Sequence, residues 1–150
     1  MLILSMVLGV CGCSGKKKTL EDFRKEAAIA SETIIRKVLS GDYEMVKRYV
    51  KEADLQYAKP VVSNMAPGII YHTSITIEDI FTEEGSYDTE VHYRLSFVYE
   101  KTISSISLVM RLERNGNSWA IANAQGFFYD INQMNSKYVY EKEAEENAKS

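Results

Sequence analysis

The sequence predicts an α+β domain in which N-terminal helices pack on one face of a curved antiparallel β-sheet. Between residues 19 and 50, apolar residues recur every three or four positions, which is the period of an amphipathic helix. Between residues 69 and 123 they alternate with polar residues, which is the period of a strand that buries one face. Short turn-like joints separate the alternating runs, so neighbouring strands are expected to be antiparallel. Helices followed by strands indicate the α+β class.

The composition fits one packed domain. The chain has 150 residues, of which 45% are hydrophobic and 26% charged, and this excludes a disordered or fibrous protein. Its net charge of −3 argues against a nucleic-acid partner, because binding DNA or RNA needs a clustered basic face. The two cysteines, Cys11 and Cys13, precede the domain, so we expect neither disulfides in it nor a metal or other cofactor.

The first helix is expected to begin next to Thr19. The Thr19 hydroxyl can cap it, and Glu21 and Asp22 place negative charge in the first turn, where the helix dipole favours it. Gly41 is expected to end this helix, and Asp42 to cap a second, shorter one. The apolar stripe of the first helix consists of Leu20, Phe23, Ala27, Ala30, Ile34 and Val38.

Strands are expected after a loop that Pro60 and Pro67 punctuate and that holds a short helical turn near residues 54–57. The Asn115-Gly116 pair is a strong hairpin signal. The chain becomes rich in Glu, Lys and Ala near its end, and residues 136–150 are expected to form a charged tail or frayed helix. The alternating runs lie at residues 69–77, 91–99, 106–112 and 119–123, with further turns at 83–86 and 100–101.

An apolar run at residues 2–10 is too short to cross a bilayer, which takes roughly 20 apolar residues. Its length and the small residues after it are those of a signal peptide. The segment Val10-Cys11-Gly12-Cys13 resembles the lipobox of bacterial lipoproteins, with an aliphatic residue three positions before the cysteine and a small residue directly before it. The resemblance implies cleavage before Cys13 and a diacylglycerol on its sulfur. The alternative is an uncleaved strand or helix of the core.

Basic residues follow the lipobox rather than precede it. Lys16, Lys17 and Lys18 belong to a short linker, where they can attract anionic headgroups or simply be solvated. Signal peptides open with Lys or Arg, and a start codon upstream of Met1 would supply the basic residues that are absent before Cys13.

Two segments resemble the nuclear transport factor 2-like domains: the helix junction Ser40-Gly41-Asp42-Tyr43 and the closing strand pair at residues 112–121. The resemblance covers about residues 19–132 and implies a cone-shaped, cystatin-like fold, which small bacterial lipoproteins also carry. A lipocalin-like or cystatin arrangement is the main alternative. The expected division is a signal peptide at 1–12, the lipidated cysteine and tether at 13–18, the nuclear transport factor 2-like domain at 19–135 and the tail at 136–150.

Aromatic side chains on the inner face of the sheet are the candidate ligand site. The cone implied by the resemblance has an apolar mouth between sheet and helices, where rings can stack on a small apolar ligand. The same rings could instead fill the core. The candidates are Tyr93, Phe97, Tyr99 and Trp119.

Catalytic chemistry has weaker candidates. Enzymes of the resembled family, of the ketosteroid isomerase kind, use an Asp base in the cone, and Asp79 or Asp130 could supply it here. We expect a solvated position for Asp79 and a turn cap for Asp130.

His72 and His92 are expected at the surface, because two histidines without carboxylate support make a poor metal site. The sequence also has no nucleophile elbow and no glycine-rich phosphate loop.

The sequence therefore favours a lipoprotein held on the outer side of a bacterial membrane through Cys13, in the cell envelope. Its domain is expected to bind a small apolar ligand or an envelope protein without catalysis. The alternative is an isomerase- or dehydratase-like enzyme with an Asp base in the cone. A second copy of the chain could pair with the first through the open face of the sheet.

Overall fold

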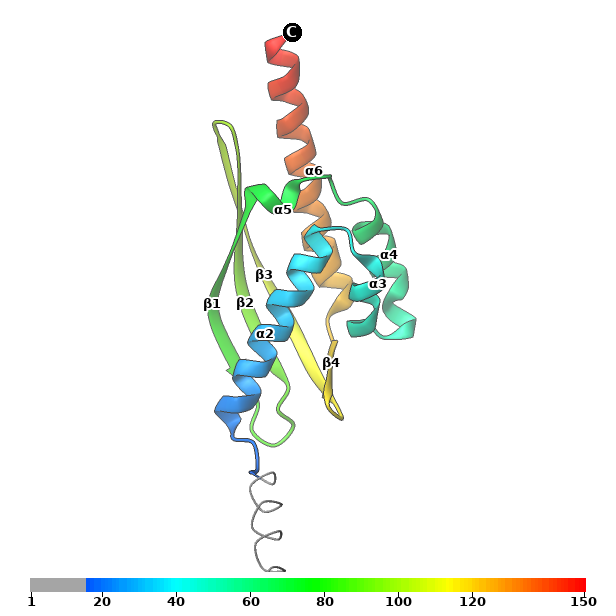
Figure 1. The fold of residues 1–150 in the computed structure, drawn as a ribbon, viewed down its shortest axis with the longest axis vertical. Coiled ribbons are helices and arrows are strands. Elements are labelled where there is room, and N and C mark those ends of the chain that lie inside the picture. The colour runs from blue at the N-terminus through cyan, green and yellow to red at the C-terminus, as the bar shows by residue number, and fades with distance from the viewer. Residues whose placement is uncertain (1–15) are drawn as a thin grey trace, which may run out of the picture.

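A computed structural model of the chain describes residues 16–150, and its α+β class is the one that the sequence predicts (Figure 1). The expected signal peptide and the expected lipidation at Cys13 fall on residues outside those described. The helices are α2 (Leu20–Leu39), α3 (Tyr43–Val46), α4 (Leu55–Ser63), α5 (Ile69–His72) and α6 (Ala124–Lys149), with 3₁₀ turns η2 (Lys47–Tyr49) and η3 (Glu52–Asp54). The strands are β1 (Thr73–Thr82), β2 (Thr89–Tyr99), β3 (Thr102–Asn115) and β4 (Ser118–Ile121).

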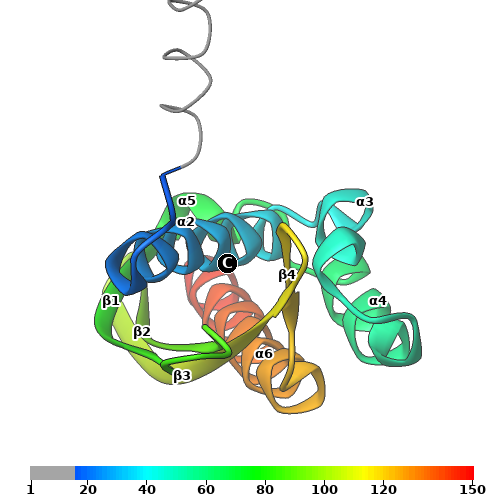
Figure 2. The same cartoon turned by 90° about the horizontal axis from the view of Figure 1, so that it is seen from below.

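The four strands form one antiparallel sheet in the order β1-β2-β3-β4, so each strand pairs with its neighbour in sequence. Figure 2 shows the sheet curved like a trough, with α2 and α6 on its concave side. Alternate residues of β2 point to that side and are buried: Val91, Tyr93, Leu95 and Phe97. The other face of the sheet is open, as expected for an antiparallel sheet with one covered side.

Helix α2 begins and ends as the sequence predicts. The Thr19 hydroxyl accepts from the Asp22 amide at 3.2 Å, and the Asp22 carboxylate accepts from the Thr19 amide at 2.8 Å, which completes a capping box. Gly41 follows the helix with φ of +73°, and the Asp42 carboxylate caps α3 by accepting from the Met45 amide at 3.2 Å. The predicted stripe faces the sheet, with Ala27, Ile34 and Val38 fully buried.

Two expectations for residues 55–72 are wrong. Pro60 lies inside α4 rather than in a loop, near the middle of a helix of only nine residues. The first alternating run does not begin as a strand, because residues 69–72 form the helical turn α5 after Gly68, whose φ is +83°. Tyr71, expected on the inner face, is 90% exposed as a result. The predicted helical turn near residues 54–57 is present as the start of α4.

A β-bulge in β1 decides where Asp79 lies. Ile77 pairs with Tyr93 on β2 and Asp79 pairs with the next residue back, His92, so Glu78 is the extra residue of the bulge. One extra residue moves the following side chains to the opposite face. Asp79 is therefore exposed, as expected, and Ile80 takes the inner side.

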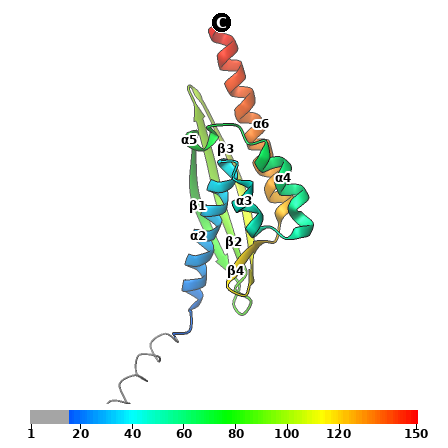
Figure 3. The same ribbon diagram turned by 45° about the vertical axis from the view of Figure 1, so that its right-hand side comes forward.

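Helix α6 is much longer than the sequence predicts. It returns across the concave side of the sheet and packs beside α4 (Figure 3). Residues 136–150, expected as a charged tail or frayed helix, are helical as far as Lys149, and Tyr138 there is only 1% exposed. Asp130, expected at a turn, lies within the helix. Its buried side chains are Ala124, Phe127, Phe128, Ile131, Met134, Asn135 and Tyr138.

Asn123, expected as the last strand residue, extends the sheet with its side chain instead. Strand β4 ends at Ile121, and the Asn123 carboxamide then accepts from the Arg111 amide and donates to the Val109 carbonyl, both at 2.8 Å. These are backbone groups of β3 that a longer β4 would have paired. The side chain thus allows the chain to leave the sheet and begin α6 at Ala124 without unpaired groups.

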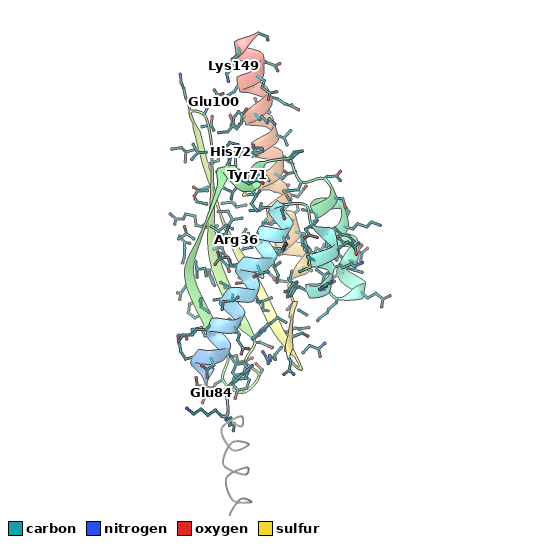
Figure 4. All side chains as sticks on the ribbon, viewed as in Figure 1. Arg36, Tyr71, His72, Glu84, Glu100 and Lys149 are labelled. Atoms are coloured by element: carbon teal, nitrogen blue, oxygen red, sulfur yellow. The ribbon has the colours of Figure 1, made fainter. Side chains whose placement is uncertain are left out.

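The molecule has two distinct ends along its long axis. Figure 4 places Glu84, in the β1–β2 turn, near the start of α2, and Glu100 and Lys149 at the opposite end. Glu100 forms an ion pair with Lys149, joining the tip of the β2–β3 hairpin to the last turn of α6. The linker that leads to Cys13 therefore meets the domain at the end away from the C-terminus. Within residues 16–150, every helix is too short or too polar to cross a membrane.

Candidate ligand-binding groove

A groove of about 490 Å³ lies between α2, η2 and the β3–β4 hairpin. This volume falls in the range of small-molecule sites, roughly 300–1,000 Å³. Helix α2 supplies positions 26, 29, 30 and 33, which share one side of a helix because they are spaced by three and four. The lining residues are Glu26, Ile29, Ala30, Thr33, Arg48, Tyr49, Asn117, Ser118 and Trp119.

Most of the groove surface is apolar. Trp119, on β4, is 6% exposed and forms part of one wall. Ile29, on α2, is 69% exposed and forms part of another. Apolar walls with a few polar groups are the usual lining of a small-molecule site.

Arg114 contacts two residues of the groove lining, Trp119 and Glu26. Its guanidinium lies 5.1 Å from the ring centroid of Trp119 and 4.9 Å from that of Phe23, so it is placed between two rings. It also donates to the Glu26 carboxylate at 2.9 Å. The ring of Phe23 stacks in turn on Tyr87, with centroids 4.0 Å apart. This stack joins the first turns of α2 to the β1–β2 turn and to both strands of the β3–β4 hairpin.

Glu26 is the acidic residue of the lining, and two cations already neutralise it. Lys18 pairs with it at 2.6 Å and Arg114 at 2.9 Å, and these two partners hold the pKa of the Glu26 carboxyl below its usual value. Arg48 also lines the groove, is exposed, and forms no ion pair with any residue in 16–150. Of the two charged residues in the lining, Glu26 is therefore paired and Arg48 is not.

The four residues predicted as a ligand site are not brought together. Trp119 lines the groove, whereas Tyr93, Phe97 and Tyr99 follow β2 toward the other end of the molecule. Tyr93 is fully buried, and its hydroxyl hydrogen-bonds with that of Ser31 on α2. Burial raises the pKa of Tyr93 to about 12. Tyr93 thus connects sheet and helix within the core.

Phe97 and Tyr99 belong to an aromatic cluster around Tyr138 of α6. Their ring centroids lie 5.5 and 5.7 Å from that of Tyr138, and His72 lies 5.9 Å from it. Phe97 also lines a small hollow of about 140 Å³ between β3 and α6. The cluster seals the upper part of the core, where the hairpin and α6 leave the body of the domain.

A second hollow, of about 380 Å³, lies where β1 ends and β2 begins, beside residues 111–113 of β3 and Ala122. It contains the carboxylates of Glu83, Asp88, Glu90 and Glu113, with Arg111 among them. The Glu90 carboxylate accepts from Arg111 at 2.8 Å and contacts the His92 ring at 2.6 Å, and these two partners lower the pKa of Glu90. Within residues 16–150 no three His, Cys, Asp or Glu side chains are placed to hold a metal ion.

The two candidate bases lie outside these hollows. Asp79 is exposed on β1, where its carboxylate accepts from the Ile80 amide at 2.9 Å. Asp130 is partly buried on α6, and burial raises the pKa of its carboxyl, but it lines none of the hollows described above. His72 and His92 lie apart, on α5 and β2, and His92 is partly buried rather than fully at the surface.

Three groove residues, Ile29, Arg48 and Tyr49, were not predicted from the sequence to share one site. Ile29 carried a usable signal, since it is an isoleucine outside the apolar stripe of α2. No sequence pattern marks Arg48 as a groove residue, because its place beside the groove depends on how η2 packs against β4. Comparison with protein-family models, with curated proteins and with solved structures found no match for this chain.

Proposed function

We propose that the protein is a lipid-anchored binding module of the bacterial cell envelope, whose domain takes up a small apolar ligand in the groove beside Trp119. The supporting observation is the groove itself: an opening of about 490 Å³ with an exposed isoleucine and a tryptophan in its walls. Its polar groups are the ion-paired carboxylate of Glu26, the Arg48 guanidinium, a carboxamide and three hydroxyls, one of them phenolic. Such a set can bind a molecule, but it offers no activated nucleophile or base.

Membrane attachment through Cys13 is the second part of the proposal. Its support is the lipobox-like Val10-Cys11-Gly12-Cys13 and the linker that enters the domain at one end, away from the hairpin tip and the C-terminus. Substitution Cys13→Ser is expected to release the protein from membranes into the soluble fraction, and Cys11→Ser, the matched control, to leave it attached. Equal membrane retention of both variants would remove the lipid anchor from the proposal.

The proposal also includes that the domain has a nuclear transport factor 2-like fold. Helices on the concave side of an antiparallel sheet and the Asn-Gly hairpin support it. The long helix α6, which follows the last strand, is the feature that departs most from the helices-then-strands order expected from the resemblance.

Ligand uptake can be tested with the protein's single tryptophan, which lines the groove and so reports on it directly. The probe is the dye 1-anilinonaphthalene-8-sulfonate. Its binding is detected by energy transfer from Trp119 to the dye, and a competing ligand in an organic extract of envelope material is detected by loss of that transfer. We expect saturable transfer that Ala30→Phe abolishes by filling the groove without adding a second tryptophan, and that Ile103→Ser, on the open sheet face, leaves unchanged. Absence of saturable transfer in the unmodified protein would contradict the proposal.

An enzyme with an Asp base, the alternative, has less support. Asp79 is solvent-exposed beside a bulge, and Asp130 lies on α6 away from the groove. A binding role for the open sheet face has more support. Val98 and Ile103 pair there across β2 and β3, and 45% and 74% of their surfaces are exposed. A second copy of the chain or an envelope protein could cover this pair.

A further inference from the structure

The groove has one positive charge that no acidic side chain neutralises. The charged residues of its lining are Glu26 and Arg48. Glu26 is neutralised from outside the lining by Lys18 and Arg114. Arg48 forms no ion pair with any of residues 16–150, although the whole chain carries a net charge of −3. A groove of this charge attracts anions and disfavours cations.

The placement of Arg48 separates charge from apolar surface. Arg48 is exposed and comes from η2, whereas Trp119 and Ala30 are partly or fully covered and lie on β4 and α2. Ile29 adds apolar surface at the opening. A ligand that satisfies both regions must have an anionic head for Arg48 and an apolar body for the walls. A guanidinium is well suited to a carboxylate, which it can bind through two hydrogen bonds.

The groove also lies in the half of the domain that the linker enters. An α-helix rises ~1.5 Å per residue, so its lining positions on α2 lie roughly 9 to 20 Å from the first turn of that helix. Five residues separate Cys13 from Thr19, and the six Cα–Cα steps between the two span at most about 21 Å when extended. A lipid on Cys13 would thus keep the groove near the bilayer surface, where single-chain amphiphiles concentrate.

We infer that the groove binds the anion of a long-chain carboxylic acid, with the carboxylate at Arg48 and the acyl chain between Ile29 and Trp119. This inference rests on the proposed ligand-binding function and narrows it to one chemical class. Charge selects the head group, and the walls accept any chain of suitable length. We therefore expect strong discrimination by head-group charge and weak discrimination by small changes of chain length.

The test compares three probes with the same chain, each below its micelle concentration: decanoate, 1-decanol and decyltrimethylammonium. Binding is followed by Trp119 fluorescence and checked by calorimetry. We expect decanoate to bind at least tenfold more tightly than 1-decanol, and the cation to bind least. Equal affinity for decanoate and 1-decanol would overturn the inference while leaving the binding function intact. Absence of binding by every probe and by the anilinonaphthalene dye would remove both.

Variants locate the head group. Arg48→Gln is expected to weaken decanoate binding about tenfold and to leave 1-decanol unaffected. Arg36→Gln is the matched control, because Arg36 lies farther along α2, paired with Glu32 at 2.8 Å and outside the groove lining (Figure 4). Ile29→Glu, at a solvent-exposed position that folding tolerates, should weaken decanoate more than 1-decanol. Identical decanoate affinities for the Arg48 and Arg36 variants would overturn the placement.

Phosphatidylglycerol vesicles separate a single acyl anion from an anionic bilayer surface. The soluble Cys13→Ser protein is expected to show no change of Trp119 fluorescence with these vesicles, and a change when decanoate is added. A response to vesicles alone, with none to free decanoate, would assign the basic groove to a membrane surface and overturn the inference.

Discussion

The guanidinium of Arg114 lies 5.1 Å above the indole of Trp119, and it is 4.9 Å from Phe23 on its other side. The arginine is largely buried, with 13% of its side chain exposed, and it donates to Glu26 at 2.9 Å. One side chain therefore connects the start of α2, the end of β3 and the wall of the groove. A planar cation is suited to this place because it can stack on rings and bind a carboxylate at once.

Arg114→Met is expected to lower the free energy of unfolding by about 1–3 kcal/mol, because it removes a charged hydrogen bond and two ring contacts. Arg114→Lys should recover only part of this loss, since an ammonium cannot stack as a plane. Urea unfolding followed by Trp119 fluorescence measures both. Arg94→Met is the control: Arg94 pairs with Glu78 on the open face, and its loss should change stability by less than about 0.5 kcal/mol. Equal effects of the Arg94 and Arg114 variants would contradict this role of the stack.

Tyr93 gives the protein a pH dependence at the alkaline end. Its pKa is raised to about 12 by burial, from an ordinary value of 10.0. Above pH 10 the unfolded chain releases this proton while the folded protein keeps it, so stability is complete below pH 10 and falls as pH rises toward 12. Tyr93→Phe should make the decline between pH 10 and 12 shallower than in the unmodified protein. Tyr129→Phe, at a position 63% exposed, should leave the slope unchanged. The opposite ranking of the two slopes would contradict the burial of Tyr93.

Asn135 attaches α6 to the connection between α4 and α5. It is 6% exposed, accepts from the Ala66 amide at 2.9 Å and donates to the Asn64 carbonyl at 3.2 Å. Asn135→Ala is expected to cost about 2–3 kcal/mol in thermal or urea unfolding, because it leaves the Ala66 amide buried without an acceptor. Asn132→Ala, one turn earlier on the same helix, should cost less than about 1 kcal/mol. Similar losses in both variants would show that helix propensity, rather than this contact, sets the effect.

The alternating pattern predicted β2 and β3 because most residues of these strands are apolar where they face inward and polar where they face outward; Val98 and Ile103 are exceptions on the open face. The alternating pattern gave wrong predictions where a glycine conformation or a β-bulge determines the local structure. The turn α5 has an alternating sequence, but Gly68 sets a left-handed start that continues into a helical turn. The bulge at Glu78 has no marker in the sequence, and it alone moves Asp79 to the open face.

Helix α6 was predictable in part. Phe127, Ile131, Met134 and Tyr138 are spaced by four, three and four residues, which is a helical stripe. Polar and charged residues surround this stripe, and Asn123 makes no capping bond that would announce its start. Of the predicted ligand residues, Trp119 lines the groove because it lies just after the hairpin turn, whereas Tyr93 is buried in the core. Which aromatic residues face a groove depends on how helices cover the sheet, and that is a property of packing between distant segments.

An exposed apolar pair on the open face of the sheet predicts that two copies of the chain associate there. Val98 and Ile103 form an apolar cross-strand pair in solvent, close to the hairpin tip. If a second copy covers this pair, the protein is a dimer at micromolar concentration, and Ile103→Glu converts it to a monomer. Size-exclusion chromatography with light scattering measures this, with Ile29→Glu as a control in the groove. A dimer that survives Ile103→Glu would exclude this face as the interface.

The central claim, that this domain is held at a membrane by a lipid on its first mature residue, is tested most directly by the intact mass of the protein extracted from membranes. The account predicts a chain that begins at Cys13, lacks residues 1–12 and carries the added mass of a diacylglycerol. A mass that includes residues 1–12, with Cys13 unmodified, would contradict it.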